Sequence, residues 1–227
     1  MASSPRPPLF DPITIPIEAI AGEAALADDR QDAKWLRQRF AAPQVWQIEH
    51  GDEHLSRSHR QDLTPASVLI PIVLREQNLT VLLTQRTAHL HDHAGQISFP
   101  GGRAEPSDAD AIETALREAE EEVGLLRQHV EVLGNLPDYY TISNYRVTPV
   151  VALIHPPFQL SADAGEVAQI FEVPFGFLMD GGNHQRRSMD LPNNQGRRGF
   201  YAMPYEEFFI WGATAAMLRN LYHFLRA

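Results

Sequence analysis

The sequence contains no cysteine among its 227 residues. This absence excludes disulfide bonds, thiolate metal ligands and cysteine nucleophiles, and it removes the usual clue to the redox compartment. Positive charge is also scarce, because 19 Lys and Arg residues stand against 29 Asp and Glu residues, for a formal net charge of -10. A general binder of nucleic acid or of anionic membranes would carry a basic surface, so both classes are disfavoured.

Long apolar runs are missing as well. No stretch approaches the ~20 apolar residues that span a membrane, and the opening residues, MASSPRPPLFDP, lack the apolar core of a signal peptide. We therefore expect a soluble, cytoplasmic protein. Hydrophobic residues make up 44% of the chain and charged residues 21%, which is an ordinary balance for a globular fold.

The character of the sequence changes near residue 65. Residues 1–64 combine a proline-rich start, a short helical pattern at 32–40 and a polar stretch, which predict an N-terminal tail and helical appendage. Residues 65–227 form the main domain in this interpretation. It opens with two runs rich in β-branched residues and leucine, and the polar turn 76–78 between them predicts a β-hairpin.

Strand and helix patterns alternate irregularly through the rest of the chain. Strands are expected at 130–137 and 145–154, a helical turn at 174–180, and a closing amphipathic helix at 208–225. The absence of a strict βαβ repeat predicts an α+β fold, with a mixed β-sheet packed between helices.

The stretch REAEEEVGL, residues 117–125, places three consecutive glutamates near the end of a predicted helix. At ~100° per residue, Glu118, Glu121 and Glu122 share one stripe, where like charges repel and a cation is therefore expected. Carboxylates at this spacing suit Mg²⁺ or Mn²⁺. Arg117 could orient one of them through a bidentate hydrogen bond. A solvated acidic face is the alternative that the glutamates alone leave open.

Capping signals bound this helix. Ser107 or Asp108 is expected to cap its start, and Gly124 to end it. A second face carries apolar side chains at helical spacing, which predict packing on the core; they are Ile112, Leu116, Ala119 and Val123.

The same segment resembles a known family motif. Residues 102–125, GRAEPSDADAIETALREAEEEVGL, are similar to the Nudix box. In the first half, Asp108 stands where the motif has glutamate, and one extra residue separates it from Arg117. That extra residue is expected of the coenzyme A pyrophosphatase branch of the family. The second half matches in register through Arg117, Glu118, Ala119, Glu121, Glu122, Gly124 and Leu125.

The segment before the box carries a second resemblance. Residues 82–102, LLTQRTAHLHDHAGQISFPGG, are similar to the segment that precedes the box in coenzyme A pyrophosphatases. This likeness implies that Arg86, His91, Gly101 and Gly102 contribute to substrate binding. His91 stands where the branch has arginine, so its positive charge would depend on pH.

The resemblance implies a Nudix αβα sandwich that hydrolyses the pyrophosphate bond of coenzyme A or its acyl or oxidised derivatives, giving 3′,5′-ADP and 4′-phosphopantetheine or a derivative. Glu118, Glu121 and Glu122 would hold Mg²⁺ or Mn²⁺. Arg117, Glu121 and Glu166 would be catalytic, and the last two are both candidates for the base that activates water. The partner would be a small-molecule substrate, with no nucleic acid and no membrane. A homodimer is possible, since dimers are common in such folds, but the sequence leaves the oligomeric state open.

Two alternatives remain open from the sequence. Another nucleoside diphosphate derivative, such as ADP-ribose or NADH, could be the substrate. A non-catalytic sensor of a nucleotide metabolite is less favoured, because Arg117 and the glutamates of the stripe are all present. In addition, the N-terminal appendage shows no DNA-binding pattern that could serve as an output module.

Overall fold

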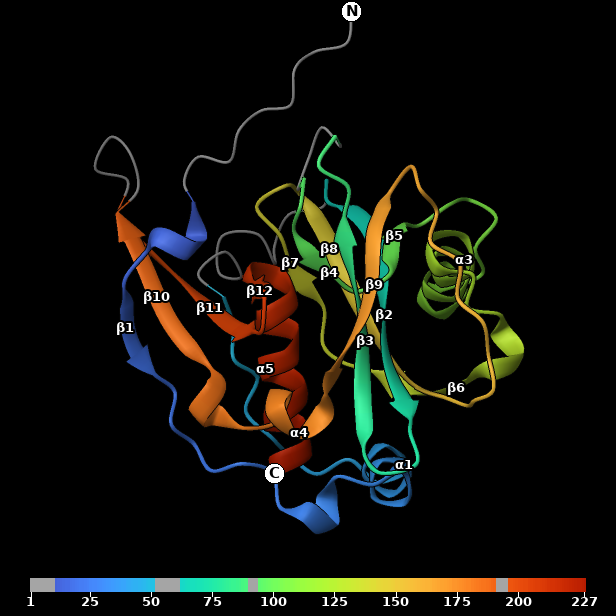
Figure 1. The fold of residues 1–227 in the computed structure, drawn as a ribbon, viewed down its shortest axis with the longest axis horizontal. Helices are drawn as coiled ribbons and strands as arrows, with labels where there is room; N and C mark the ends of the chain where they lie inside the picture. The colour runs from blue at the N-terminus through green and yellow to red at the C-terminus, as the bar shows by residue number, and fades with distance from the viewer. Residues whose placement is uncertain (1–10, 52–61, 90–93, 191–195) are drawn as a thin grey trace, which may run out of the picture.

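The computed structural model describes residues 11–51, 62–89, 94–190 and 196–227, which form two sheets packed with helices (Figure 1). The larger sheet has the strand order β4-β3-β2-β8-β6, with β5 paired to β2, β7 to β8 and β9 to β3. The smaller sheet has the order β1-β10-β11-β12. Helices α3 (Ala111–Val123) and α5 (Gly212–Arg226) cover opposite faces of the larger sheet.

Each sheet draws strands from distant parts of the chain. The larger sheet contains β2 (Thr64–Leu74), β3 (Leu79–Arg86), β4 (Ile97–Ser98), β5 (Gly101–Arg103), β6 (Val130–Asn135), β7 (Tyr139–Tyr140), β8 (Tyr145–Ile154) and β9 (Val167–Pro174). The smaller sheet contains β1 (Ile17–Ile20), β10 (Gln185–Asp190), β11 (Arg197–Tyr205) and β12 (Phe208–Trp211). The other helices are α1 (Ala33–Ala41) and α4 (Phe175–Leu178).

Strands β2 and β8 form the centre of the larger sheet. They run parallel, from the pair Thr64 and Tyr145 to the pair Val73 and Ile154. Strand β3 pairs antiparallel with β2, so the predicted hairpin is confirmed and the sheet is mixed. Both central strands are buried over most of their length, which explains their nearly continuous apolar sequences.

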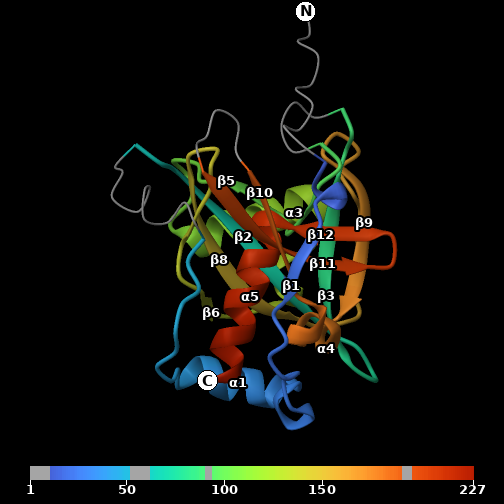
Figure 2. The same cartoon turned by 90° about the vertical axis from the view of Figure 1, so that its left-hand side faces the viewer.

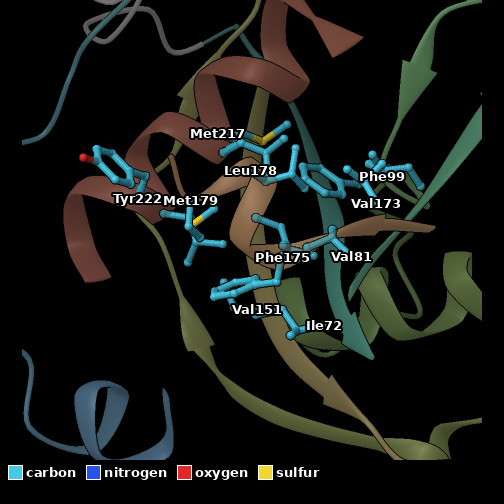
Figure 3. Packing of buried hydrophobic residues seen from close by; sticks show 14 of the residues in the cluster. Ile72, Val81, Phe99, Val151, Val173, Phe175, Leu178, Met179, Met217 and Tyr222 are labelled. Carbon is cyan, nitrogen blue, oxygen red and sulfur yellow. The ribbon is translucent and has the colours of Figure 1, made fainter. Parts of the chain in front are cut away.

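Side chains alternate between two apolar layers. One layer packs beneath α3 and includes Leu69 and Val150. The other packs against α5 and α4, and Figure 3 shows Ile72, Val151 and Phe175 within it. Because successive strand residues point to opposite faces, β2 and β8 supply both layers and fix the helices on either side of the sheet.

Helix α3 begins later than its sequence predicts. Asp110 is the N-cap, and its carboxylate accepts hydrogen bonds from the backbone N–H groups of Ile112 and Glu113 at 2.9 and 3.0 Å. The prediction of Ser107 or Asp108 was wrong, because the Asp108 carboxylate is bonded to other side chains. The predicted end is confirmed, since Gly124 adopts a left-handed conformation with φ 68°.

The packed face of α3 also differs by one position from its prediction. Ala115 is fully buried in the layer beneath the helix, together with Ala119 and Val123, and Ile112 packs against them. Leu116 is half-buried and lies outside this layer. The small Ala115 side chain lets the helix approach the sheet closely, which brings the neighbouring glutamates to the sheet surface.

The closing helix is shorter than expected. Residues Phe208–Trp211 form strand β12, which pairs antiparallel with β11, and α5 starts only at Gly212. The prediction of a helix from residue 208 was therefore wrong in its first turn. Strand pairing with residues 202–205 overrides the local helical pattern there. The expected helical turn at 174–180 is confirmed as α4.

The N-terminal residues are built into the same body. Strand β1 pairs with β10, which lies about 170 residues further along the chain. Helix α1 lies beside the C-terminal end of α5 (Figure 2), and Arg39 donates to the carbonyl of Phe224 there. The division into residues 1–64 and 65–227 stays a prediction about domain organisation. Among the described residues, no helix has the length and apolar character needed to cross a membrane.

A buried ionic cluster joins the N-terminal residues to α5. The Arg219 guanidinium donates to Glu23 at 2.9 and 3.0 Å and to Glu49 at 2.8 and 3.1 Å, and its side chain is 3% exposed. Hydrogen bonding to Arg219 lowers the pKa of Glu23 to about 2. The pKa of Glu49 is also about 2, since bonds from His223, Tyr201 and Arg219 outweigh the effect of burial.

This cluster predicts acid sensitivity that can be tested by substitution. The pKa values of Glu23 and Glu49 lie below the ordinary 4.5, so their stabilisation is complete above about pH 4.5 and is lost as pH falls towards 2. Arg219→Leu should lower the free energy of unfolding at pH 7 by about 3–5 kcal/mol, because it removes the cation that Glu23 and Glu49 share.

Urea unfolding at pH 7 and pH 3 measures both effects. Arg197→Gln is the control, since Arg197 forms an exposed ion pair with Glu18 and should change stability by under about 1 kcal/mol. Equal stability losses for the two variants would contradict the role assigned to Arg219.

Candidate functional site

Strands β2, β3 and β5 and helix α3 meet at one end of the larger sheet, the upper end in Figure 1. Strands β2 and β3 are antiparallel, so the last residue of β3, Arg86, lies near the first half of β2. Strand β5 pairs with that half through Ser67 and Gly102. Helix α3 packs over the same region, where Gly102 approaches Glu118. The candidate site is the space between these elements.

The glutamate stripe divides into an inner and an outer part. Glu122 is buried, with 4% of its surface exposed, and the Glu118 side chain is 16% exposed. Glu121 is turned outward, with a side chain that is 61% exposed. The structure therefore brings Glu118 and Glu122 into the site and leaves Glu121 at its rim.

The two glycines of β5 allow this close packing. A Cβ atom on Gly102 would lie 2.5 Å from the Glu118 carboxylate, so no other residue fits without moving that group. A Cβ atom on Gly101 would lie 2.6 Å from the Cα of Val68. The Gly101 N–H also donates to Glu122 Oε2 at 3.1 Å. Both glycines shape the carboxylate site through the backbone.

Arg117 links most of the acidic groups. Its Nη1 donates to Glu118 and to Glu121, each at 2.9 Å, and its Nε and Nη2 donate to Asp108 at 3.0 Å. Nη2 also donates to the carbonyl of Arg103 at 3.0 Å, which ties α3 to β5. Arg117 thus bonds the predicted ligands Glu118 and Glu121 through one nitrogen only, and its bidentate partner is Asp108 rather than either of them.

The sequence marked Asp108 as the acidic residue in the first half of the motif, but it did not predict that Asp108 would bind Arg117. Its carboxylate also accepts a hydrogen bond from Thr114 Oγ1 at 2.9 Å and one from the backbone N–H of Glu105 at 2.9 Å. The Arg117 guanidinium, followed by these bonds, holds the pKa of Asp108 well below its usual range. Asp108 is therefore a fixed anion that sets the orientation of Arg117.

Arg86 and Glu166 complete the described part of the site. Arg86 Nη1 lies 3.7 Å from Glu122 Oε1, and Nη2 lies 3.9 Å from Glu166 Oε2. The Arg86 Nε atom is buried without a hydrogen-bond partner among the described residues. Glu166 belongs to the loop between β8 and β9, and its side chain is 52% exposed. The structure thus places Arg86 beside Glu122, and Glu166 beside Arg86.

The inner carboxyl groups are electrostatically strained. Burial, together with smaller effects of Glu166 and Glu118, raises the pKa of Glu122 to about 8, although the Gly101 N–H and Arg86 oppose the shift. Burial also raises the pKa of Glu118, with Glu121 and Glu166 adding to the effect and Arg117 opposing it. A cation at this position would relieve the repulsion.

The side chains are not arranged as a metal cage. Among residues 11–51, 62–89, 94–190 and 196–227, no three acidic or histidine side chains are grouped in a way that could hold a metal ion. Arg117 accounts for this, because its Nη1 binds both Glu118 and Glu121. His91, predicted to bind substrate, lies outside the described residues.

Comparison with known proteins identifies this arrangement. The family model described as "NUDIX domain" matches residues 63–174. The uncharacterized Nudix hydrolase NudL of Escherichia coli K12 is 43% identical over 164 residues, which cover 72% of this chain and 82% of the relative. The chain belongs to the Nudix hydrolase family. Nudix hydrolases generally use divalent metal ions and act on small molecules, which are nucleoside diphosphate derivatives.

Solved Nudix structures resemble the chain more weakly. The Ap4A hydrolase of C. elegans, in a binary complex, is 17% identical and covers 48% of this chain and 80% of its own, with a TM-score of 0.43. A MutT Nudix hydrolase of Burkholderia pseudomallei is 18% identical and covers 69% and 98%, with a TM-score of 0.41.

The buried Glu122 carboxyl predicts how this Nudix hydrolase responds to pH without metal. Its pKa of about 8 exceeds the ordinary 4.5, so its contribution to stability is complete below about pH 4.5 and is lost as pH rises towards and through 8. In EDTA, Glu122→Gln should therefore raise the melting temperature at pH 8.5 relative to the original protein and change it little at pH 4.5.

Glu121→Gln is the matched control, because that side chain is largely exposed. Thermal unfolding in EDTA at the two pH values measures the difference. If Glu122→Gln lowers the melting temperature equally at both pH values, the Glu122 carboxyl is not held in the strained state described above.

Proposed function

We propose that the protein hydrolyses the pyrophosphate bond of coenzyme A or of its acyl or oxidised derivatives, giving 3′,5′-ADP and 4′-phosphopantetheine or a derivative. The observation that carries this proposal is the contact between two sequence segments. Arg86 and Gly101, from the segment that resembles coenzyme A pyrophosphatases, both face Glu122 of the Nudix box. Residues 82–102, which resemble coenzyme A pyrophosphatases, and the acidic face of α3 therefore lie at one site.

The residues at this site fit a divalent cation, for which we propose Mg²⁺ or Mn²⁺. Glu118, Glu121 and Glu122 offer carboxylate oxygens, which hard cations prefer. Burial and the neighbouring acids raise the pKa of Glu122 to about 8, which means that its charged form is disfavoured. A bound cation would stabilise that charged form. Binding requires Glu118 and Glu121 to give up at least part of their bonding to Arg117. When bound, the metal acidifies water and neutralises phosphate oxygens.

Each protein residue then has a proposed role. Glu118 and Glu122 supply oxygen ligands from the inner face of α3, and Glu121 supplies one from the rim. Arg117, fixed by Asp108, keeps the helix and β5 together while the carboxylates change partners. Arg86 lies between Glu122 and Glu166, where its guanidinium can donate hydrogen bonds to a phosphate oxygen.

Glu166 is the better candidate for the base that takes a proton from water. The Arg86 guanidinium lies between the Glu166 carboxylate and buried Glu122, which supports this assignment. Glu121 instead points outward and is bonded to Arg117. Cytoplasmic location and homodimer formation stay predictions from the sequence.

The metal site predicts a large loss of activity on a small chemical change. Glu122→Gln keeps the size of the side chain but removes an ionic ligand, so kcat/KM for coenzyme A should fall by about 10²-fold or more. Glu120→Gln is the control, because Glu120 is exposed and pairs only weakly with Arg127, at 3.7 Å. Steady-state assays at saturating Mg²⁺ and at saturating Mn²⁺ measure the effect, and near-normal turnover of Glu122→Gln would remove Glu122 from the ligand set.

The assignment of the base predicts a second contrast. Glu166→Gln should lower kcat by about 10²–10⁴-fold, as loss of a general base does, and should leave KM nearly unchanged. Glu121→Gln should cause a smaller loss of kcat. The pH profile of kcat checks the role, since its acidic limb should disappear only in Glu166→Gln. The reverse ranking of the two variants would assign the base to Glu121.

A substrate panel separates the proposed function from its alternatives. The purified protein is incubated with Mg²⁺ or Mn²⁺ and coenzyme A, acyl coenzyme A esters, ADP-ribose, NADH or nucleoside triphosphates, and products are identified by mass. Release of 4′-phosphopantetheine or an acyl derivative is the expected result. Preferential cleavage of ADP-ribose or NADH would replace the proposed substrate, and binding without cleavage of any substrate would favour a sensor.

A further inference from the structure

Arg103 directs its side chain away from the carboxylate site. It follows Gly102 in β5, and successive residues of a strand point to opposite faces. Since a Cβ atom on Gly102 would point at the Glu118 carboxylate, the Arg103 side chain leaves the strand on the other side. It nevertheless lies at the same end of the sheet, one residue from the acidic site.

Tyr145 is the partner of Arg103 on the far side of β2. Arg103 pairs with Ala66 and Tyr145 pairs with Thr64, so the two side chains meet across the first residues of that strand. Arg103 Nη2 donates to Tyr145 Oη at 3.2 Å, and the Arg103 guanidinium carbon lies 5.9 Å from the centre of the Tyr145 ring. The ring thereby supports a guanidinium group that is exposed to solvent.

Arg103 differs from the neighbouring arginines in its charge balance. Within the described part of the chain, no carboxylate forms an ion pair with Arg103. Arg117 is bonded to three acidic residues, and Arg86 lies between two. Exposed Arg146, next to Tyr145, lies 3.8 Å from Asp138. Arginine has five N–H donors in a planar fork, so Arg103 keeps donors available for an anion from solution.

The surrounding charge favours a phosphate beside Arg103 over a phosphate among the carboxyl groups of α3. Carboxyl groups outnumber guanidinium groups around α3, because Glu118, Glu121, Glu122 and Glu166 lie around only Arg86 and Arg117. A phosphate that is not in contact with bound metal would be repelled there. Such a group is better placed on the Arg103 side of β5, within a substrate's length of the acidic site.

We propose that Arg103 and Tyr145 form a subsite for a phosphomonoester that the substrate carries outside its pyrophosphate link. The 3′-phosphate of coenzyme A has this chemistry, and the inference rests on the proposed function for that assignment. The Arg103 guanidinium binds two phosphate oxygens, and the Tyr145 hydroxyl donates to a third. This subsite selects substrates that carry the additional phosphate, and it takes no part in breaking the pyrophosphate bond.

Binding measurements test the subsite without requiring any turnover. Isothermal titration calorimetry in Mg²⁺ compares adenosine 3′,5′-bisphosphate with adenosine 5′-monophosphate. The original protein should bind the bisphosphate about tenfold or more tightly than the monophosphate, as a charge-assisted contact allows. Arg103→Gln should abolish this preference and leave monophosphate affinity unchanged, and Tyr145→Phe should reduce the preference by a smaller factor. Arg146→Gln is the matched control and should keep the preference in full.

Kinetics then link the subsite to the reaction. Arg103→Gln should raise KM for coenzyme A about tenfold, keep kcat, and leave both constants unchanged for 3′-dephospho-coenzyme A. If the original protein cleaves neither compound, the proposed function fails, while the binding comparison still decides the subsite. The subsite is overturned if the original protein shows no preference for the bisphosphate, if Arg103→Gln retains that preference, or if this substitution weakens both nucleotides equally.

Discussion

Repulsion between carboxyl groups is the constraint on which this site depends. Helix α3 turns Glu118 and Glu122 inward to a sheet end where Glu166 also lies, and burial makes their charged forms unfavourable. Arg117 offsets part of this repulsion by bonding to Glu118, Glu121 and Asp108. The remaining excess of negative charge is what a divalent cation would offset, and Nudix hydrolases generally use such ions.

The fold maintains this unfavourable grouping through close backbone contacts. Glycines in β5 let the strand approach Glu118 and let a backbone N–H bond to Glu122. Ala115 and Ala119 let α3 lie close to the central strands β2 and β8. Small residues thus bring the acids together, while the apolar layers on both faces of the sheet supply the stability that opposes the repulsion.

Local patterns predicted the elements whose signals are contained within short segments. The hairpin of β2 and β3, the end of α3 at Gly124 and the pairing of Arg117 with acids all follow from residues close in sequence. The N-cap was misassigned because Asp108 and Asp110 both fit the local pattern. In the structure Asp108 is bonded to the Arg117 side chain, and Asp110 is the residue that caps the helix. The start of α5 was misplaced because β12 is fixed by pairing with β11. Partners far apart in the chain, such as β1 with β10 or Glu23 with Arg219, leave no local signal.

The most direct measurement is a titration of the purified protein with Mn²⁺, in which electron paramagnetic resonance follows the free ion at pH 7.5. The original protein should bind Mn²⁺ stoichiometrically, and the double variant Glu118→Gln with Glu122→Gln should lose that binding while Glu120→Gln retains it. Unchanged Mn²⁺ affinity in the double variant would contradict the account, because the strained carboxyl groups of α3 would then not be the metal site.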